Sequence, residues 1–375
     1  SPNYKIMSKN SYEIYVDCGL SKLRANGFHK TNSKKNFYIE SKFLFDHTEI
    51  NLEAQRIIVY LEKNTNEYID SINLMVDSPK MLSIGISISK KIDGLQLEQD
   101  DIQFLLREAR QEISKFYKNQ NITHIIINNY KVNDVDYDHL PLNIKCNFIA
   151  LDILFICIPD EIIEYYKNIF YKFDISINQI ICSSYAKAKN YEEYLSIHKN
   201  ISFIDLGYKK TSIITYTNNK ITCLNTLPIG GSHITKDISK VLKIDLEQAE
   251  KIKINFDKKE KLLNREDFSL EFLQKIIFAR IDEILKMCAE SIKLNSIITN
   301  SFKVILTGEG SKILNNQYKD DFFIVHDLDL IEEQTQDVCR AGFTLGMSLN
   351  RKEVTVVPKK LIKRGFFEKF FHFFG

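Results

Sequence analysis

The sequence predicts an α/β protein made of two related halves that face each other across a cleft. Strand-like and helix-like segments alternate along most of its 375 residues, which is typical of α/β domains. A strand, an Asp-x-Gly turn and a second strand begin each half, at 12–25 and at 201–216. The aspartates of these turns, Asp17 and Asp205, are half the chain apart, so the pattern indicates an internal duplication.

The composition is that of a soluble globular protein. Hydrophobic residues make up 44% and charged residues 27%, with a formal net charge of +2, which argues against global disorder and a bulk nucleic-acid-binding surface. The seven cysteines form no C-x-x-C pair, so we expect reduced cytosolic thiols rather than disulfides or a zinc site. The sequence has no secretory signal and no apolar run of transmembrane length, so we expect it to be neither exported nor membrane-spanning. Residues 1–6 precede Met7 and are expected to be an expression remnant.

Hydrophobic periodicity and turn residues predict the elements between the two hairpins. They are, in chain order, a helix at 51–66, a strand at 71–76, an amphipathic helix at 99–117, a strand at 123–130, a polar loop at 134–145 and a strand at 148–158. Since the block 83–158 interrupts the first half, we expect it to be a small inserted α/β subdomain.

The second half alternates in the same way. Its predicted elements are short helices at 237–241 and 246–255, a long helix at 269–294, a strand at 302–306, a helix opening near Ser311, a helix at 335–350 and a polar linker at 351–358.

Glycine is scarce, with 13 residues in the chain, and six of these glycines lie at the ends of predicted strands. These are Gly19, Gly207, Gly230, Gly231, Gly308 and Gly310. A turn with few side chains lets backbone N–H groups approach phosphate oxygens, so two facing hairpins could clamp a triphosphate. Asp17 and Asp205 would then hold Mg²⁺ through water. The alternative is that each Asp-x-Gly segment is an ordinary β-turn.

Five motifs in this order resemble the actin-like ATP-binding proteins and, more narrowly, the FtsA family of bacterial cell-division proteins. They are Asp17-x-Gly19, Asp205-x-Gly207, Ile229-Gly-Gly-Ser-His-Ile-Thr-Lys-Asp-Ile238, Ala249-Glu250-x-Ile-Lys253 and Leu306-Thr307-Gly308-x-Gly310. The resemblance runs from about residue 12 to the end of the sequence. It implies an actin/Hsp70-like duplicated ATPase fold with an FtsA-type inserted subdomain and a C-terminal amphipathic helix.

The resemblance also implies ATP or ADP with Mg²⁺ as the ligands of the cleft. Phosphate contact is implied at Gly19, Ser21, Lys22 and Gly207, and adenosine contact at Glu250, Lys253, Gly308 and Ser311. With the neighbouring motif residues, the candidate nucleotide site comprises Asp17, Gly19, Ser21, Lys22, Asp205, Gly207, Lys209, Lys210, Gly230, Gly231, Glu250, Lys253, Thr307, Gly308, Gly310 and Ser311.

The second phosphate hairpin departs from the family pattern. FtsA proteins usually continue the Asp-Ile-Gly motif with Gly-Gly-Thr, whereas this sequence has Tyr208-Lys209-Lys210. Two glycines and a hydroxyl are lost, and in the first hairpin Leu20 stands where a Thr or Ser is common. We therefore expect ATP binding with weak or no ATPase activity, and assign no catalytic residue.

Segment 276–284 resembles the FtsA helix that receives the C-terminal tail of FtsZ. The match makes Arg280 and Glu283 candidate partner-binding residues, because a guanidinium suits the carboxylates of an acidic peptide. The alternative is a surface ion pair between Arg280 and Glu283, which are three residues apart.

The segment 351–375 is strongly basic, with seven Lys/Arg and two acidic residues. At helical spacing its apolar residues share one face, and lysine and arginine precede them: Ile362, Phe366, Phe367, Phe370, Phe371, Phe373 and Phe374, with Lys359, Lys360, Lys363 and Arg364. Such a helix is too short to span a bilayer but suits an anionic membrane surface. The alternative is a terminal helix docked on the body.

The expected subdomain bounds follow the family's nomenclature. They are 1A at 7–82 and 159–200, inserted 1C at 83–158, 2A at 201–235, 2B at 236–302, 2A and a return to 1A at 303–350, a linker at 351–358 and a membrane-targeting helix at 359–375.

The resemblance implies a division-site protein on the cytoplasmic face of the inner membrane that tethers FtsZ filaments, self-assembles and contacts other division proteins through 1C. The alternatives are a type IV pilus-assembly adaptor of the same fold and an actin-fold small-molecule kinase.

Overall fold

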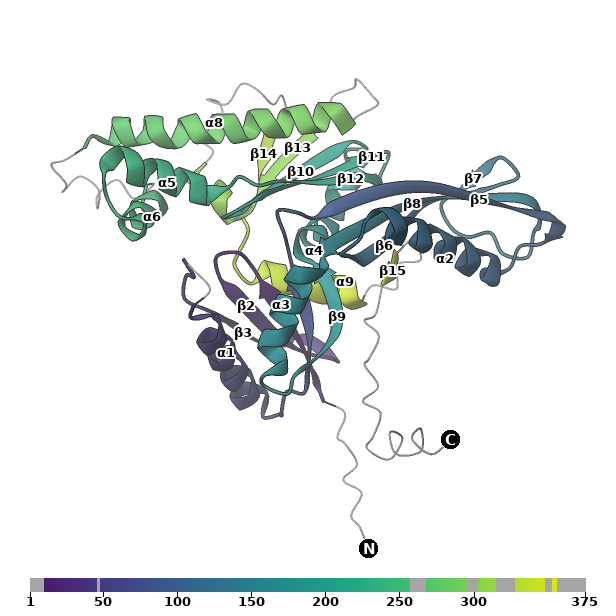
Figure 1. Ribbon diagram of the computed structural model, residues 1–375, viewed down its shortest axis with the longest axis horizontal. Coiled ribbons are helices and arrows are strands. Elements are labelled where there is room, and N and C mark those ends of the chain that lie inside the picture. Colours follow the sequence, from purple (N-terminus) through teal and green to yellow (C-terminus); the bar gives the residue numbers. More distant parts are fainter. Residues whose placement is uncertain are drawn as a thin grey trace, which may run out of the picture.

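Two five-stranded sheets with the same strand order form the two halves of the molecule (Figure 1). The computed structural model describes residues 10–45, 48–256, 268–295, 303–314, 328–347 and 353–355. The first sheet has the order β3 (Asn32–Glu40), β2 (Leu23–His29), β1 (Tyr12–Cys18), β4 (Ser71–Val76) and β9 (Ser176–Cys182). The second has the order β12 (Lys220–Leu227), β11 (Thr211–Thr217), β10 (Ile201–Leu206), β13 (Lys303–Thr307) and β14 (Leu328–Leu330).

The duplication predicted from the two hairpins is confirmed by the pairing of these strands. In each sheet three consecutive strands are antiparallel and the first of them also pairs with a parallel strand, β4 in one half and β13 in the other. Asp17 and Asp205 hold equivalent places, since each is the second-last residue of its strand. Carboxyl ends of parallel strands meet at one edge of a sheet, and the two edges that carry these aspartates face each other.

A third sheet carries the block inserted into the first half. Its order is β15 (Glu353–Thr355), β6 (Gln120–Val132), β8 (Lys145–Pro159) and β5 (Leu82–Gln96), with β7 (Val135–Tyr137) paired to β6. Helix α2 (Gln99–Phe116) begins at a capping box formed by Glu98 and Asp101 and covers one face of this sheet (Figure 1). The apolar face predicted for this helix is buried: Ile102, Leu105, Leu106, Ala109 and Ile113.

The remaining helices cover the two duplicated sheets (Figure 1). In the first half these are α1 (Ile50–Thr65), α3 (Asp160–Tyr171), α4 (Ser183–Asn190), the 3₁₀ turn η1 (Glu192–Ser196) and α9 (Asp337–Met347). In the second half they are α5 (Gly231–Leu242), α6 (Leu246–Ile254), α8 (Leu270–Asn295) and the 3₁₀ turn η2 (Glu309–Ile313). Helix α9 returns to the first half, where a Cβ at Gly342 would lie 2.4 Å from the Met75 sulfur.

Several predicted elements were wrong in extent. The helix expected at 237–241 begins six residues earlier, because Gly230 and Gly231, which look like a turn, start α5. The loop expected at 134–145 contains β7, and the helix expected near Ser311 is the short turn η2. Part of the expected linker is strand β15, since Val354 and Thr355 are β-branched and suit an edge strand.

The prediction of reduced thiols agrees with the structure, in which all seven cysteines are buried and free. In the described part of the chain no helix is both long and apolar enough to cross a bilayer. The predicted amphipathic helix at 359–375 lies outside the described residues.

Candidate functional site

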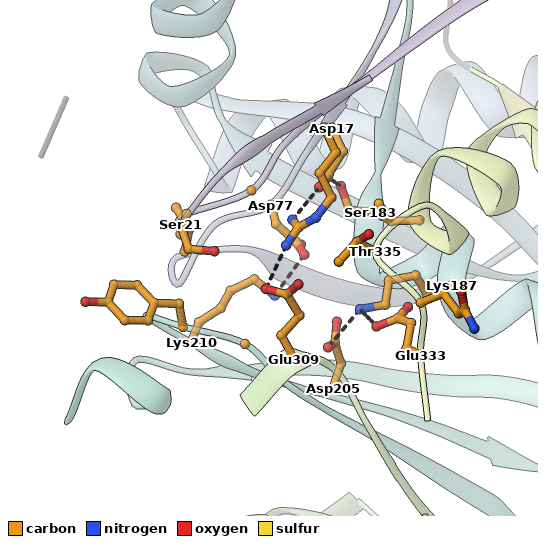
Figure 2. Close-up of a pocket in the computed structure, with 17 residues that line it drawn as sticks. Asp17, Ser21, Asp77, Ser183, Lys187, Asp205, Lys210, Glu309, Glu333 and Thr335 are labelled. Atoms are coloured by element: carbon orange, nitrogen blue, oxygen red, sulfur yellow. Dashed lines mark hydrogen bonds and ion pairs between the residues drawn. The ribbon is translucent and has the colours of Figure 1, made fainter. Parts of the chain in front are cut away.

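The two halves meet at a narrow cleft lined by charged side chains (Figure 2). Its cavity of about 90 Å³ is much smaller than the roughly 300–1,000 Å³ of typical small-molecule sites. Five carboxylates and three basic side chains line it: Asp17, Asp77, Asp205, Glu309 and Glu333, with Arg24, Lys187 and Lys210.

Both carboxylate oxygens of Asp17, the first aspartate of the duplicated pair, have partners within the protein. Ser183, at the start of α4, donates its hydroxyl to Asp17 Oδ1 at 2.6 Å, and Arg24 Nη1 lies 3.4 Å from Oδ2. Burial raises the pKa of Asp17, and the Arg24 charge and the Ser183 hydrogen bond only partly oppose it. Arg24 also reaches across the cleft, with Nη2 2.7 Å from Glu309 Oε2 in the second half.

The second aspartate is paired with a lysine from α4. Lys187 Nζ lies 2.9 Å from Asp205 Oδ1 and 2.9 Å from Glu333 Oε2. Burial alone would raise the pKa of Asp205, but the charges of Lys187 and Lys210 lower it. Burial raises the pKa of Glu333 despite the same lysine. Asp205 is therefore the carboxylate that Lys187 keeps ionised.

A second lysine crosses the cleft in the opposite direction. Lys210, at the end of the hairpin turn between β10 and β11, extends toward the end of β4, where its Nζ lies 2.9 Å from Asp77 Oδ2 (Figure 2). Nζ also donates to Ser184 Oγ at 3.1 Å and to Ser212 Oγ. Lys210 and Asp77 are 5% and 7% exposed, so this ion pair is shielded from solvent.

These contacts test whether the cleft fits the Mg²⁺ that the fold family implies. The oxygens of Asp17 and Asp205 that would bind it are bonded to Ser183, Arg24 and Lys187. Mg²⁺ requires oxygen ligands at about 2.0–2.1 Å in near-ideal octahedral geometry. Within the described ranges no group of three or more His, Cys, Asp or Glu side chains could hold a metal ion. Asp17 and Asp205 therefore do not offer free oxygens for direct coordination of Mg²⁺ in this geometry.

The second hairpin packs directly onto the start of α5. Gly231 N–H donates to the Gly207 carbonyl at 2.9 Å and Ser232 N–H to the Tyr208 carbonyl at 2.6 Å. A Cβ at Gly230 would lie 2.5 Å from the Gly207 oxygen, so only glycine permits this approach. The first donors of α5 therefore bind the chain's own hairpin instead of presenting themselves to a phosphate.

Two of the residues expected to contact adenosine, Glu250 and Lys253, form a hydrogen-bonded network beside this hairpin. Lys253 Nζ donates to Glu250 Oε2 at 2.7 Å, Thr235 Oγ1 at 2.9 Å and the Gly231 carbonyl at 3.0 Å. Burial lowers the pKa of Lys253, although Glu250 opposes this. The three ammonium hydrogens are thus used within the protein.

Tyr208 joins this network to the first half. Its ring centroid is 5.3 Å from Lys253 Nζ and 4.9 Å from the ring of Phe43, which meets it edge-on from the loop after β3. Tyr208 stands where the family has glycine, so its ring takes up space that the family pattern leaves open.

The predicted site residues divide into two groups. Six line the cleft: Asp17, Gly19, Ser21, Asp205, Gly207 and Lys210. The Ser21 side chain faces the cleft and makes no hydrogen bond within the described part of the chain. Ten lie outside its lining: Lys22, Lys209, Gly230, Gly231, Glu250, Lys253, Thr307, Gly308, Gly310 and Ser311. Gly308 has φ +91°, and a Cβ there would lie 2.4 Å from Asp205 Oδ1, so it supports the aspartate from behind.

Sequence reasoning missed most of the charged lining. The residues concerned are Arg24, Asp77, Ser183, Lys187, Glu309 and Glu333. Asp77 had a usable signal, because it follows a predicted buried strand directly. Lys187 and Glu333 had none, since α4 was not predicted and Glu333 belongs to a loop.

The candidate partner-binding residue lies away from the cleft, on α8. Arg280 Nε and Nη2 donate to the two oxygens of Asp237 on α5 at 2.6 and 3.0 Å, and Nη1 donates to Glu283 at 2.6 Å. The guanidinium is one-quarter exposed. The ion pair with Glu283 weighed in the sequence is therefore present, together with a bidentate pair that was not predicted.

Comparison with known proteins agrees with the fold. The family described as "Cell division protein FtsA" matches residues 202–276. Proteins of that name from Streptococcus pneumoniae serotype 2 and Bacillus subtilis strain 168 are 26% and 28% identical over 170 and 150 residues. These matches cover 42% and 36% of this chain, and 37% and 33% of the relatives' own length.

A solved structure covers more of the molecule. A chain of the "PilM-PilN type IV pilus biogenesis complex" superposes with a TM-score of 0.59 at 12% identity, over 88% of this chain and 94% of that chain. At this identity the likeness shows the fold, which is the actin-like ATPase fold.

Proposed function

We propose that this chain, which is similar to FtsA proteins and has an actin-like ATPase fold, is a cell-division protein that tethers FtsZ filaments to the cytoplasmic membrane. The observation that carries the proposal is the match of residues 202–276 to the FtsA family, on a fold whose two halves and inserted sheet have the expected order. The protein would act at the division site and self-assemble into actin-like filaments.

We propose that the cleft binds ATP or ADP and turns it over slowly or not at all. The Gly19 turn and the Ser21 hydroxyl are available to phosphate oxygens. The second hairpin, however, has Tyr208 in place of glycine, and the first donors of α5 are used internally. Because the cavity is about 90 Å³, a nucleotide would enter only when the cleft opens.

The proposed FtsZ-tail site lies on the face shared by α5 and α8. Arg280 is held by Asp237 and Glu283, so its guanidinium has a fixed position and two of its five N–H groups remain for a ligand carboxylate. Phe272, eight residues earlier on α8 and about 12 Å away along the helix axis, is 46% exposed and offers apolar contact to an extended ligand. An acidic-hydrophobic peptide matches both features.

Membrane attachment is assigned to residues 359–375, on the sequence pattern alone. Six phenylalanines follow a basic segment, which suits insertion into an interface rich in anionic lipid. A type IV pilus-assembly adaptor is the second candidate function, because the PilM–PilN complex supplies the solved structure with the same fold.

Co-sedimentation tests the tether directly. FtsZ filaments, the full chain and anionic liposomes are mixed, and lipid-bound FtsZ is measured. We expect FtsZ to pellet with the lipid only when the chain is present, and expect Arg280→Ala to reduce this more than the matched change Lys275→Ala on the same helix. FtsZ that stays in solution with the wild-type chain, while the chain itself binds lipid, would contradict the tether and favour the pilus-adaptor alternative.

A further inference from the structure

We infer that the cleft binds its nucleotide without a divalent cation, because Lys187 and Lys210 already pair with the cleft carboxylates Asp205 and Asp77. The inference rests on the nucleotide binding proposed above and adds a cation requirement that differs from the Mg²⁺ implied by the fold family.

The positions of the two ammonium groups carry the inference. Lys187 Nζ and Asp205 Oδ1 are 2.9 Å apart, as are Lys210 Nζ and Asp77 Oδ2, and both pairs lie at the carboxyl ends of the central strands (Figure 2). The carboxylates of Asp77 and Asp205 also accept the Ser184 hydroxyl, at 2.7 and 3.3 Å. A divalent ion therefore cannot bind Asp77 Oδ2 or Asp205 Oδ1 without displacing a lysine.

Three basic side chains supply positive charge in a lining that also holds five carboxylates. The two lysines together carry the +2 charge of one divalent cation, and Arg24 adds a third positive charge opposite the Gly19 turn. Lys187 and Lys210 side chains are 12% and 6% exposed, so these charges act in a poorly screened environment.

Both lysines come from elements that would border an entering triphosphate. Lys187 is on α4, behind Asp205, and Lys210 follows the Gly207 turn of the phosphate hairpin. Phosphate oxygens can exchange with carboxylate oxygens as partners of an ammonium group. Free ATP then replaces Asp77 and Asp205 at these lysines, whereas Mg²⁺ bound to ATP competes with them for the same oxygens.

Binding of ATP to the full chain, measured by titration calorimetry in excess Mg²⁺ and in excess EDTA, tests this. We expect the affinity in EDTA to equal or exceed that in Mg²⁺. We also expect Lys210→Met to weaken binding in EDTA by at least about tenfold, as loss of a charged phosphate contact should. Lys240→Met is the matched control, since Lys240 is exposed on α5 and lies outside the lining, and we expect it to bind as wild type.

A second experiment looks for a gain of metal binding, which a variant that merely failed to fold would not show. Mn²⁺ binding to the nucleotide-free chain is followed by electron paramagnetic resonance. We expect none in the wild type and a bound ion in the double variant Lys187→Ala with Lys210→Ala, because Asp77 and Asp205 are then freed.

The outcomes separate the two proposals. Tight ATP binding in Mg²⁺ that is lost in EDTA overturns the cation-free site and leaves the nucleotide proposal intact. Absence of ATP binding in both conditions overturns both. Mn²⁺ binding to the wild-type chain at the cleft overturns the replacement of the metal by lysine.

Discussion

The ammonium group of Lys210 lies 2.9 Å from the Asp77 carboxylate, although the two residues belong to opposite halves of the molecule. Together with the Arg24–Glu309 pair, which also crosses the cleft, it closes the halves on each other. Two ion pairs between side chains therefore join the halves of the molecule across the cleft.

Breaking this pair should cost stability. We expect Lys210→Met to lower the free energy of unfolding by about 3 kcal/mol, because it leaves the Asp77 carboxylate buried without its cation. Adding Asp77→Asn should restore part of the loss. A double-mutant cycle in urea measures this coupling, and additive effects of the two changes would show that the pair contributes nothing.

Removing the Tyr208 ring should open the cleft. Tyr208 contacts Phe43 from the first half and Lys253 from the second, so we expect Tyr208→Ala to raise the affinity for ATP while lowering the melting temperature. The lost aromatic contact is worth about 1 kcal/mol beyond the buried area. Calorimetric titration and thermal unfolding measure the two effects, and Tyr171→Ala on the exposed side of α3 is the control. An unchanged ATP affinity would mean that the ring does not restrict the cleft.

The Glu53 carboxylate fixes the loop that carries Phe43, and its contribution to stability depends on pH. Glu53 accepts the Lys42 N–H at 3.0 Å and the Arg56 guanidinium at 2.9 Å. Burial alone would raise the pKa of Glu53, but these partners lower it below its ordinary value of 4.5. A lowered folded pKa stabilises the protein above the unfolded pKa, and the effect is lost as the pH falls through the folded pKa.

We therefore expect Glu53→Gln to reduce the free energy of unfolding at pH 7, and expect the difference from wild type to shrink as the pH falls below 4.5. Urea unfolding at a series of pH values measures it. A difference that stays constant down to strongly acidic pH would contradict the assigned ionisation.

Substituting the two residues of the Asp237–Arg280 pair should change the affinity for the FtsZ tail in opposite directions, which tests the proposed site. Asp237 places a negative charge beside the Arg280 N–H groups that a peptide carboxylate would bind, so Asp237→Asn should strengthen peptide binding and Arg280→Ala should weaken it, each by a few-fold and more at low salt. Fluorescence anisotropy of a labelled FtsZ-tail peptide measures both. If neither change alters the affinity, the peptide binds elsewhere.

The membrane binding predicted for residues 359–375 has an apolar and an electrostatic contribution, which two double variants test separately. We expect Phe366→Glu with Phe370→Glu to abolish liposome pelleting at any salt concentration, because it removes buried aromatic area. Lys363→Ala with Arg364→Ala should reduce pelleting mainly on anionic vesicles at low salt. A double phenylalanine variant that pellets like wild type would instead favour the docked-helix alternative.

The sequence predicted the parts of the site that repeat and missed the parts that do not. Asp17 and Asp205 were found because each ends a β-hairpin strand, and the duplication fixes their position relative to each other. Lys187 reaches Asp205 from a helix in the other half, a tertiary contact that leaves no local pattern. Gly230 and Gly231 are predicted to contact phosphate, whereas Gly230 is explained by close packing against Gly207, and a Cβ at Gly231 would lie 3.3 Å from Lys253 Nζ.

The position of strand β15 determines which part of the molecule would lie nearest a membrane that the following segment binds. Thr355 pairs with His124 at the outer edge of the inserted sheet, and Lys359 comes four residues later. A fully extended chain of that length reaches about 14 Å, so a lipid-bound helix starting there would bring this edge near the bilayer. In Figure 1, β15 lies on the side of the inserted sheet away from α8. A chain attached in this way would hold α8 farther from the bilayer than the β15 edge of the inserted sheet.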